Sequence, residues 1–177
     1  MKVTREQVAE RREKILNAAG RLFRERGFEA VTIADVMKEA GLTHGAFYGH
    51  FRSKDDLVAQ TLARLLTINK KALDPTRFAN DYLTPELRDD FGGGCATAGL
   101  AAETIRQAPQ ARAALTDGLR RSIENLSNGT PENKQARRNA IGSWAAMVGA
   151  IILARATDDP NLSDEILEQT RRWIAEK

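Results

Sequence analysis

The chain has 177 residues, of which 42% are hydrophobic, enough for the core of one domain or two small ones. One cysteine excludes an internal disulfide framework, no apolar run approaches the ~18 residues of a membrane span, and the first residues lack the apolar core of a signal peptide. Charge is uneven, since residues 1–54 hold 11 Lys and Arg against 7 Asp and Glu, whereas the rest hold 16 and 17.

Apolar residues at helical spacing predict helices through almost the whole chain, and no β-alternation is present. The first helix is expected from about Thr4 to Arg26, with one apolar stripe along its length. Two short helices follow it. A longer helix is then expected from Ser53 to about Leu73, where Asp74-Pro75 stops it.

The two short helices carry local start and stop signals. Thr32 precedes an apolar pattern and is followed three residues later by Asp35, which predicts a capping box. Gly41 can take the left-handed conformation that ends a helix. Thr43 is then expected to cap the second short helix, and Ser53 the helix that follows.

The second half of the chain is predicted as further helices. The expected elements are a short helix over 75–82, a loop over 84–94, a helix from Cys95 to Gln107, one from Pro109 to about Asn128, a long one opened by Thr130-Pro131 and ending near Thr157, and a last one capped by Ser163 and running to Lys177.

Residues 32–51 have the spacing of a helix-turn-helix unit. Ala46, Phe47 and Phe51 fall on one face of the second short helix and can anchor it against the first. The other face is left outward. A short helix, a turn of about three residues and a second short helix form the unit whose second helix fits the DNA major groove.

This stretch resembles the DNA-binding domain of the TetR family of transcriptional regulators, over about residues 10–66. The matching segments stand in register and are Ile15-Leu16, Ala18-Ala19, Leu22-Phe23, Arg26-Gly27-Phe28, Thr32-Ile33-Ala34-Asp35-Val36, the run from Ala40 to Phe51, and Ser53-Lys54-Asp55-Asp56-Leu57. The rest of the chain resembles the family in its helical character and length.

The resemblance implies an all-α fold with an N-terminal three-helix helix-turn-helix DNA-binding domain, residues 1–54, and a C-terminal helical effector-binding and dimerisation domain, residues 55–177. It implies a homodimeric regulator, most often a repressor, that binds double-stranded DNA with two half-sites and is released by a small molecule. The basic excess lies in the expected reading domain, although a solvated mixed-charge helix surface would give the same charge.

The resemblance also implies roles for single residues. Residues at the positions that the family uses on the DNA backbone are Thr32, Tyr48, His50 and Lys54. Residues at the exposed start of the recognition helix, expected to face base edges, are Thr43, His44 and Gly45. Each has a structural alternative, because a threonine can serve only as a cap, and Tyr48 or His50 can be a packing residue.

The long helix near the end of the chain is apolar nearly all round and contains small residues at helical spacing, which predicts burial on more than one side. In the family the last two helices pair with those of a second subunit as a four-helix bundle. An internal core is the alternative, and the two are compatible.

A small-molecule site is expected between the helices of residues 82–153. Candidate effector contacts are Phe78, Tyr82, Leu100, Glu103, Trp144 and Met147. Because few polar groups stand out among them, a largely apolar effector is expected. Buried aromatic residues and methionines are more often core than ligand contacts.

Cys95 follows three glycines and starts a helix. A helix N-terminus stabilises a thiolate, and a flexible glycine run could expose it, so a thiol sensor of oxidants or electrophiles is a second hypothesis. A small buried residue in a crowded place is the alternative.

An enzyme is not expected. No phosphate-binding glycine loop, nucleophile motif or metal-spaced histidine pair is present, so neither a metal site nor a cofactor is predicted. A helical interaction protein that does not bind DNA is a third class, and it would leave the helix-turn-helix register unexplained.

Overall fold

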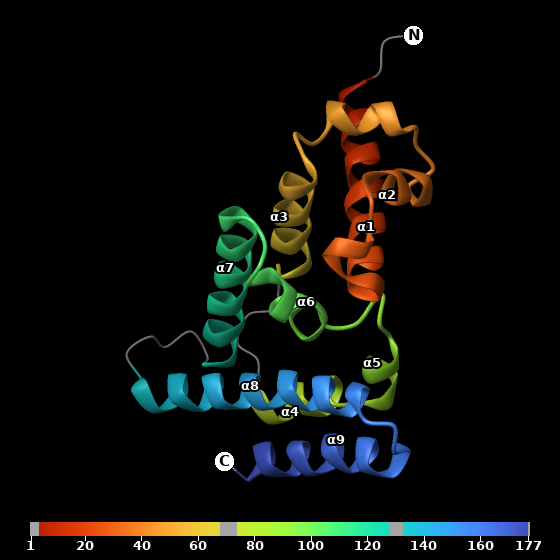
Figure 1. Cartoon of the computed structure of the whole chain (residues 1–177). Helices are drawn as coiled ribbons and strands as arrows, with labels where there is room; N and C mark the ends of the chain where they lie inside the picture. Colours follow the sequence, from red (N-terminus) through yellow and green to blue (C-terminus); the bar gives the residue numbers. More distant parts are fainter. Residues whose placement is uncertain (1–3, 68–73, 128–132, 177) are drawn as a thin grey trace.

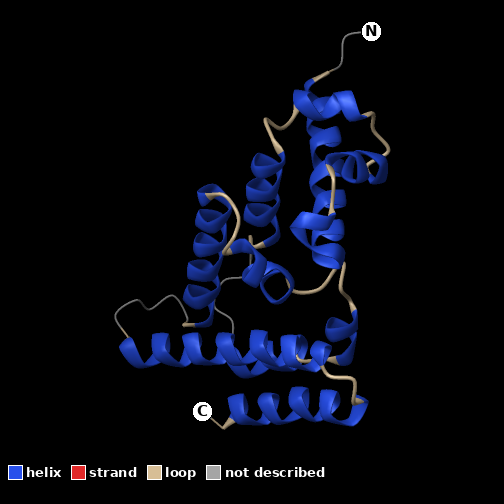
Figure 2. Cartoon of the chain, in the orientation of Figure 1, coloured by secondary structure: helices blue, strands red, loops and turns tan. Residues whose placement is uncertain are grey.

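The structure, a computed structural model, describes residues 4–67, 74–127 and 133–176. Within these ranges the chain consists of helices joined by loops, and no strand is present (Figure 2). In chain order the helices are α1 (Arg5–Ala30), α2 (Ile33–Glu39), the 3-10 helix η1 (His44–Gly49), α3 (Lys54–Leu65), α4 (Pro75–Tyr82), α5 (Pro85–Asp89), α6 (Ala96–Thr104), α7 (Pro109–Leu126), α8 (Lys134–Ala156) and α9 (Pro160–Ala175). The all-α prediction is confirmed.

The helices are spread between two ends of the molecule. Helices α1, α2, η1 and α3 gather at one end, and α8 and α9 lie side by side at the other (Figure 1). Helix α7 packs along α3, and α6 contacts both α1 and α8. Helices α6 and α7 therefore contact both ends of the molecule.

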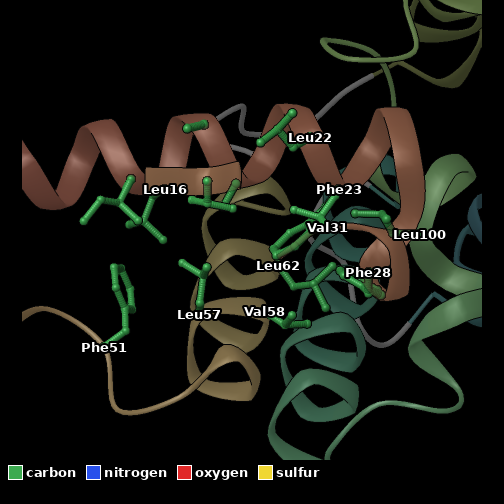
Figure 3. Close-up of a cluster of buried hydrophobic side chains, with 14 of the residues drawn as sticks. Leu16, Leu22, Phe23, Phe28, Val31, Phe51, Leu57, Val58, Leu62 and Leu100 are labelled. Carbon is green, nitrogen blue, oxygen red and sulfur yellow. The ribbon is translucent and has the colours of Figure 1, made fainter. Parts of the chain in front are cut away.

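A first hydrophobic cluster holds the N-terminal end together. Figure 3 shows Leu16 and Phe23 of α1 facing Leu57 and Leu62 of α3. These side chains are at most 3% exposed, and burying each contributes ~1.5–3 kcal/mol to folding. The same cluster includes Leu100 of α6 and Ala111 of α7, so the N-terminal helices share a core with the rest of the chain.

A second cluster lies at the opposite end, between α4, α7, α8 and α9. Its buried members with the largest side chains are Tyr82, Leu83, Leu126, Trp144, Met147, Ile151, Leu167 and Ile174. Because α8 contributes Trp144, Met147 and Ile151 to it, one side of α8 is a core surface. The other side is exposed.

Helix α8 is long and apolar enough, by length and composition, to cross a membrane, and 39% of the relevant window is buried within the chain. The sequence analysis overlooked this window because Gly142, Ser143, Gly149 and Arg155 interrupt its apolar runs. Packing of its buried side against α7 and α9 is the arrangement of a core helix.

Several predicted boundaries are corrected by the structure. The predicted loop over 84–94 contains α5, because the Thr84 hydroxyl accepts the Leu87 N–H at 3.2 Å and Pro85 stands at the first helical position. Arg155 of α8 donates to the carbonyls of Leu87 and Arg88, at 3.0 and 2.7 Å, and so satisfies the C-terminal end of this short helix.

Other helices begin or end at different residues from those predicted. Helix α3 ends at Leu65 rather than near Leu73, and part of the predicted extension lies outside the described residues. Helix α8 is capped by Asn133, whose side chain accepts the Ala136 N–H at 3.0 Å, and Thr130-Pro131 lie outside the described residues. Asp159, not Ser163, caps α9, and the Ser163 hydroxyl donates to the Ala154 carbonyl at 2.7 Å.

Helix α1 contains a sharp kink at Gly27, whose backbone has φ 80° and ψ 169°. This region of backbone space is essentially restricted to glycine. The Glu103 carboxylate lies 2.5 Å from the position that a Cβ of residue 27 would occupy, and it accepts the Phe28 N–H at 2.8 Å. The kink thus brings a free backbone donor of α1 to a carboxylate of α6.

Gly27→Ala is expected to lower the free energy of unfolding by ~2 kcal/mol or more, because the new methyl group adds backbone strain and displaces Glu103. Urea unfolding followed by circular dichroism measures it. Gly99→Ala in α6 is the matched control, since a Cβ there meets ordinary contacts at 3.8 Å, and it should be neutral or stabilising. Equal stabilities of the two variants would contradict the assignment of strain.

Candidate nucleic-acid interface and ligand cavity

Helix α2 and the turn that follows it are stabilised by local hydrogen bonds. The Thr32 hydroxyl accepts the Asp35 N–H at 3.1 Å, and the Asp35 carboxylate accepts the Thr32 N–H at 2.9 Å. The Thr32 hydroxyl also donates to the Asp35 carboxylate at 2.6 Å, and this bond, together with that from the Thr32 N–H, lowers the pKa of Asp35. Gly41, at φ 68°, closes α2, and the Leu42 N–H donates to the Met37 carbonyl at 2.9 Å. The predicted capping box and left-handed glycine are confirmed.

The second short helix, η1, is a 3-10 helix rather than the α-helix expected, and the Thr43 side chain makes no capping bond to it. Phe47, which is fully buried and stacked on Phe51 at a centroid distance of 5.6 Å, anchors it to the N-terminal core. Two glycines in six residues weaken an α-helix, which favours this short, tight geometry.

The outward side of η1 presents an unoccupied polar surface. Thr43, His44 and Gly45 are exposed, and the Tyr48 side chain is 64% exposed. The His44 and Tyr48 rings lie edge to face, with centroids 6.2 Å apart. A Cβ at Gly45 would meet no atom within 4 Å, so a partner can approach the backbone there.

Lys54 is the first residue of α3 and lies half-buried beside the end of α1. Its Nζ donates to the Glu29 carbonyl at 3.5 Å, while the Ser53 hydroxyl accepts the Asp56 N–H at 3.1 Å and caps the helix as predicted. A lysine charge at a helix N-terminus, where backbone N–H groups are free, is a favourable place for an anion such as a phosphate.

His50 is half-buried at the end of η1. Burial lowers the pKa of His50, and the charges of Arg11 and Arg12 on α1 lower it further. Arg12 also lies over the Phe51 ring, 5.5 Å from its centroid. His50 and the two arginines therefore form a basic patch next to the outward side of η1.

A cavity of about 250 Å³ lies between the two ends of the molecule. Its wall is formed by residues of α1, α3, α4, α5, α6, α7, α8 and the loops beside them, namely Arg24, Leu65, Leu66, Phe78, Tyr82, Leu87, Gly93, Gly94, Cys95, Ala96, Thr97, Ser122 and Trp144. Among the described residues no group of three or more metal-binding side chains is present.

Three aromatic rings stand together in the cavity wall. The Tyr82 ring centroid lies 5.6 Å from those of Phe78 and Trp144, and the latter two are 6.2 Å apart. The Tyr82 hydroxyl and the Trp144 Nε1 are buried and have no hydrogen-bond partner among the described residues. Burial raises the pKa of Tyr82 far above its ordinary value, and the neighbouring Cys95 raises it further.

Cys95 caps α6, and its sulfur accepts the Ala98 N–H at 3.4 Å. The glycines before it form a closely packed turn instead of the flexible run predicted. The Gly93 N–H donates to the Asp90 carboxylate at 2.6 Å, and the Gly94 N–H donates to the Asp90 carbonyl at 3.0 Å. Glycine is required at position 94, because a Cβ there would collide with that carbonyl.

Residues 15–61 match a family described as bacterial regulatory proteins, tetR family. A stretch of 63 residues is 38% identical to the HTH-type transcriptional repressor KstR2 of Mycolicibacterium smegmatis, covering 36% of this chain and 31% of that protein. A stretch of 62 residues is 44% identical to the HTH-type transcriptional regulator TtgR of Pseudomonas putida, covering 35% and 30%. The matches thus span about a third of the curated relatives' length.

The whole fold is similar to solved structures. The reduced form of E. coli NemR superposes with a TM-score of 0.74 at 24% identity, covering 94% of this chain and 95% of that one. A TetR-family regulator from Agrobacterium tumefaciens gives 0.72 at 22%, covering 94% and 98%. Over the whole chain these structures show a shared fold, and the family that residues 15–61 match is the tetR family. This is a family of regulatory proteins rather than of enzymes.

The structure separates the predicted effector contacts into two groups. Phe78, Tyr82 and Trp144 line the cavity. The other three lie outside its wall. Leu100 and Met147 are fully buried in the first and second clusters, and Glu103 holds the Phe28 N–H.

Arg24 of α1 is a cavity residue that the sequence analysis missed. Its Nη1 donates to the carbonyls of Gly93 and Gly94, at 3.2 and 3.0 Å. Burial lowers the pKa of Arg24, while the charge of nearby Asp90 opposes the shift. Because its partners lie about seventy residues away in the sequence, no local pattern indicates this contact. The TetR resemblance also assigns its helix to the DNA-reading domain.

If His50 contacts a DNA phosphate, binding will depend on pH. Phosphate stabilises the imidazolium, whereas in the free protein the pKa of His50 lies below 6.5. Complex formation is therefore expected to take up a proton, and affinity to rise as pH falls through the range between the free and bound pKa values. The gain is about tenfold for each unit by which DNA raises the pKa.

Fluorescence-anisotropy titrations at several pH values check this expectation. His50→Gln should remove the dependence, whereas His44→Gln, which removes the other histidine of this surface, should leave it. An unchanged pH profile in His50→Gln would show that His50 is a packing residue.

Proposed function

We propose that the chain is a sequence-specific DNA-binding transcriptional regulator, a homodimeric repressor that a small effector releases from its operator. The observation that carries the proposal is the outward surface of η1, where Thr43, His44, Gly45 and Tyr48 project from a segment anchored by buried Phe47. A rigid anchor behind an exposed polar surface is what a recognition helix requires.

The residues divide by chemistry into two roles. Exposed Thr43 and His44 offer hydrogen-bonding groups to base edges, and Gly45 lets the backbone come close. Thr32, Tyr48, His50 and Lys54 surround them with hydroxyl, imidazole and ammonium groups suited to phosphate oxygens. Thr32 remains exposed while it caps α2, so one hydroxyl can serve both purposes.

Dimerisation is assigned to the uncovered side of α8 and α9. Large apolar side chains there are 43–59% exposed, namely Ile141, Ile152, Leu153, Leu162 and Trp173. Gly142 and Gly149 of α8 face open space, so a second helix can approach closely. Exposed apolar surface beside small residues fits a helix-to-helix contact with a second copy.

The proposed division of labour follows the two ends of the molecule. Residues 1–54 read DNA, and residues 55–177 bind the second subunit and, together with Arg24 of α1, the effector. The cavity lies where α1 meets the other helices, so a ligand that prefers one arrangement of these helices would shift the spacing of the two reading surfaces. Such a regulator acts in the cytoplasm, beside the DNA.

Binding to DNA is the direct test. Ligand-stripped protein is titrated against duplexes selected from a random-sequence pool and from the region upstream of its own coding sequence, in gel shifts across a salt series. Saturable binding that weakens steeply with salt is expected, because phosphate contacts release counterions. If neither source yields a bound duplex at low salt, the DNA-binding function is rejected in favour of a helical interaction protein.

A thiol sensor is a second candidate, favoured by the position of Cys95 in the cavity wall beside the Arg24 charge. A cation near a thiol favours the reactive thiolate. The Cys95 thiol is then expected to react with a chromogenic disulfide at neutral pH at least tenfold faster than in urea-unfolded protein. Labelling no faster than in the unfolded chain would leave Cys95 a structural cap of α6.

A further inference from the structure

The cavity contains a cation, Arg24, that forms no ion pair with a described carboxylate, although the charge of Asp90 acts on it from nearby. Arg24 is the only charged side chain among the described residues that line it. In the described part of the chain no carboxylate oxygen lies within 4.0 Å of an Arg24 nitrogen, and its Nε is buried without a partner. A partly buried charge is normally paired, so this site is incomplete in the chain alone.

Two other buried polar groups of the wall can also bind an acceptor group of a ligand. Within the described ranges the Tyr82 hydroxyl, which has the Cys95 sulfur nearby, and the Trp144 Nε1 are buried without an oxygen or nitrogen acceptor, and the Trp144 N–H can only donate. The three aromatic rings supply flat apolar surfaces, and they would also attract a cation, but Arg24 repels one. A ligand with an apolar, planar body and one anionic acceptor group satisfies every one of these features.

The size of the cavity limits the ligand further. About 250 Å³ is below the ~300–1,000 Å³ of pockets for drug-sized molecules, so one or two rings fill it. We propose that the cavity binds a small aromatic carboxylic acid, whose carboxylate pairs with Arg24 and whose ring packs against Phe78, Tyr82 and Trp144. The inference rests on the proposed function for its consequence but not for the binding itself.

The consequence follows from the place of Arg24 in the fold. It belongs to α1 of the reading domain, and its present partners, the carbonyls of Gly93 and Gly94, lead directly into α6. A carboxylate on Arg24 competes with these carbonyls. The acid would thus change the contact between α1 and α6 directly, beside the Glu103 bond to the Phe28 N–H.

Calorimetric titration of the full chain tests the proposal with matched pairs of probes, 2-naphthoate against 2-naphthamide and benzoate against benzamide. At least one acid is expected to bind at least tenfold more tightly than its neutral amide. In Arg24→Gln this ratio should fall below threefold, and Arg24→Lys should restore part of it. Arg112→Gln, an exposed arginine of α7, is the charge-matched control and should keep the full ratio.

Further variants keep the test independent of the folding of Arg24→Gln. Tyr82→Phe keeps the ring and Trp144→Phe keeps a smaller aromatic ring, and each should weaken the acid several-fold by removing one donor. Equal affinities for acid and amide in the native protein, an unchanged ratio in Arg24→Gln with native circular dichroism, or no saturable binding of either acid up to millimolar concentration would overturn the proposal. DNA binding measured without ligand shows separately whether the proposed function stands.

Discussion

The combined variant Tyr48→Phe, Lys54→Ala is expected to bind its selected duplex about a hundredfold more weakly than the native protein at physiological salt. Tyr48→Phe removes a hydroxyl donor from an exposed ring, and Lys54→Ala removes a positive charge at the start of α3. A dimer loses each contact twice. The slope of log affinity against log salt should therefore decrease by about 2, one unit for each lysine.

The fold should tolerate both changes, because neither side chain carries packing that the core needs. Tyr48 is 64% exposed, and its ring is kept by phenylalanine. Lys54 makes one long contact, at 3.5 Å, and the Ser53 cap of α3 remains. Loss of affinity with an unchanged circular dichroism spectrum would then report on the interface itself.

Lys134→Ala is the matched control for the lysine, since Lys134 is likewise the first residue of a helix, α8, at the opposite end of the molecule. Its affinity and salt slope should stay within twofold of the native values. A double variant that binds as tightly as the control, or with the same salt slope, would remove Tyr48 and Lys54 from the DNA interface.

Features set by a few neighbouring residues could be predicted from the sequence. The Thr32–Asp35 box, the left-handed Gly41 and the Ser53 cap depend on hydrogen bonds that span three or four residues. Both ends of helix α4 were predicted correctly, because Pro75 starts it and the segment after Tyr82 has the composition of a loop. Local chemistry determines such elements almost regardless of the surrounding fold.

Features that depend on distant partners could not be predicted. Helix α5 is completed by Arg155, which lies far along the chain, and the Gly93-Gly94 turn is held by Arg24 of α1. Each segment alone has the composition of a loop. The cavity shows the same limit, since its aromatic wall was anticipated from residue type, whereas Arg24, the one charged side chain among the described residues of the wall, comes from a helix expected to serve DNA binding.

The 3-10 geometry of η1 is an intermediate case. The sequence analysis predicted which residues face inward, and Phe47 and Phe51 are indeed buried at 0% and 2% exposure. It predicted the wrong helix type, because the choice between i+3 and i+4 hydrogen bonds depends on how the anchored phenylalanines pull the backbone against α1 and α2. The exposed residues of η1 were therefore predicted correctly, whereas its backbone geometry was not.

Gly142→Glu is expected to convert the protein from dimers to monomers and to abolish DNA binding at concentrations where the native protein is saturated. A Cβ at Gly142 meets no atom within 4 Å in the subunit, so the substitution fits the isolated fold. It should even favour α8, because glutamate is a better helix former than glycine by roughly 0.5–1 kcal/mol. A bulky charge placed between two closely packed helices of different subunits would instead be buried without a partner.

Analytical ultracentrifugation measures the outcome, and circular dichroism checks that the helical content is kept. Ala113→Glu, which adds the same charge at an exposed position of α7, should remain dimeric and bind DNA. The distinction is informative because a defect in folding and a defect in assembly predict opposite changes in the subunit's helix. Monomers of full helical content place the interface on α8, and with it the coupling of two reading surfaces that an operator of two half-sites needs. Dimers of unchanged affinity would move the interface to another face of the molecule.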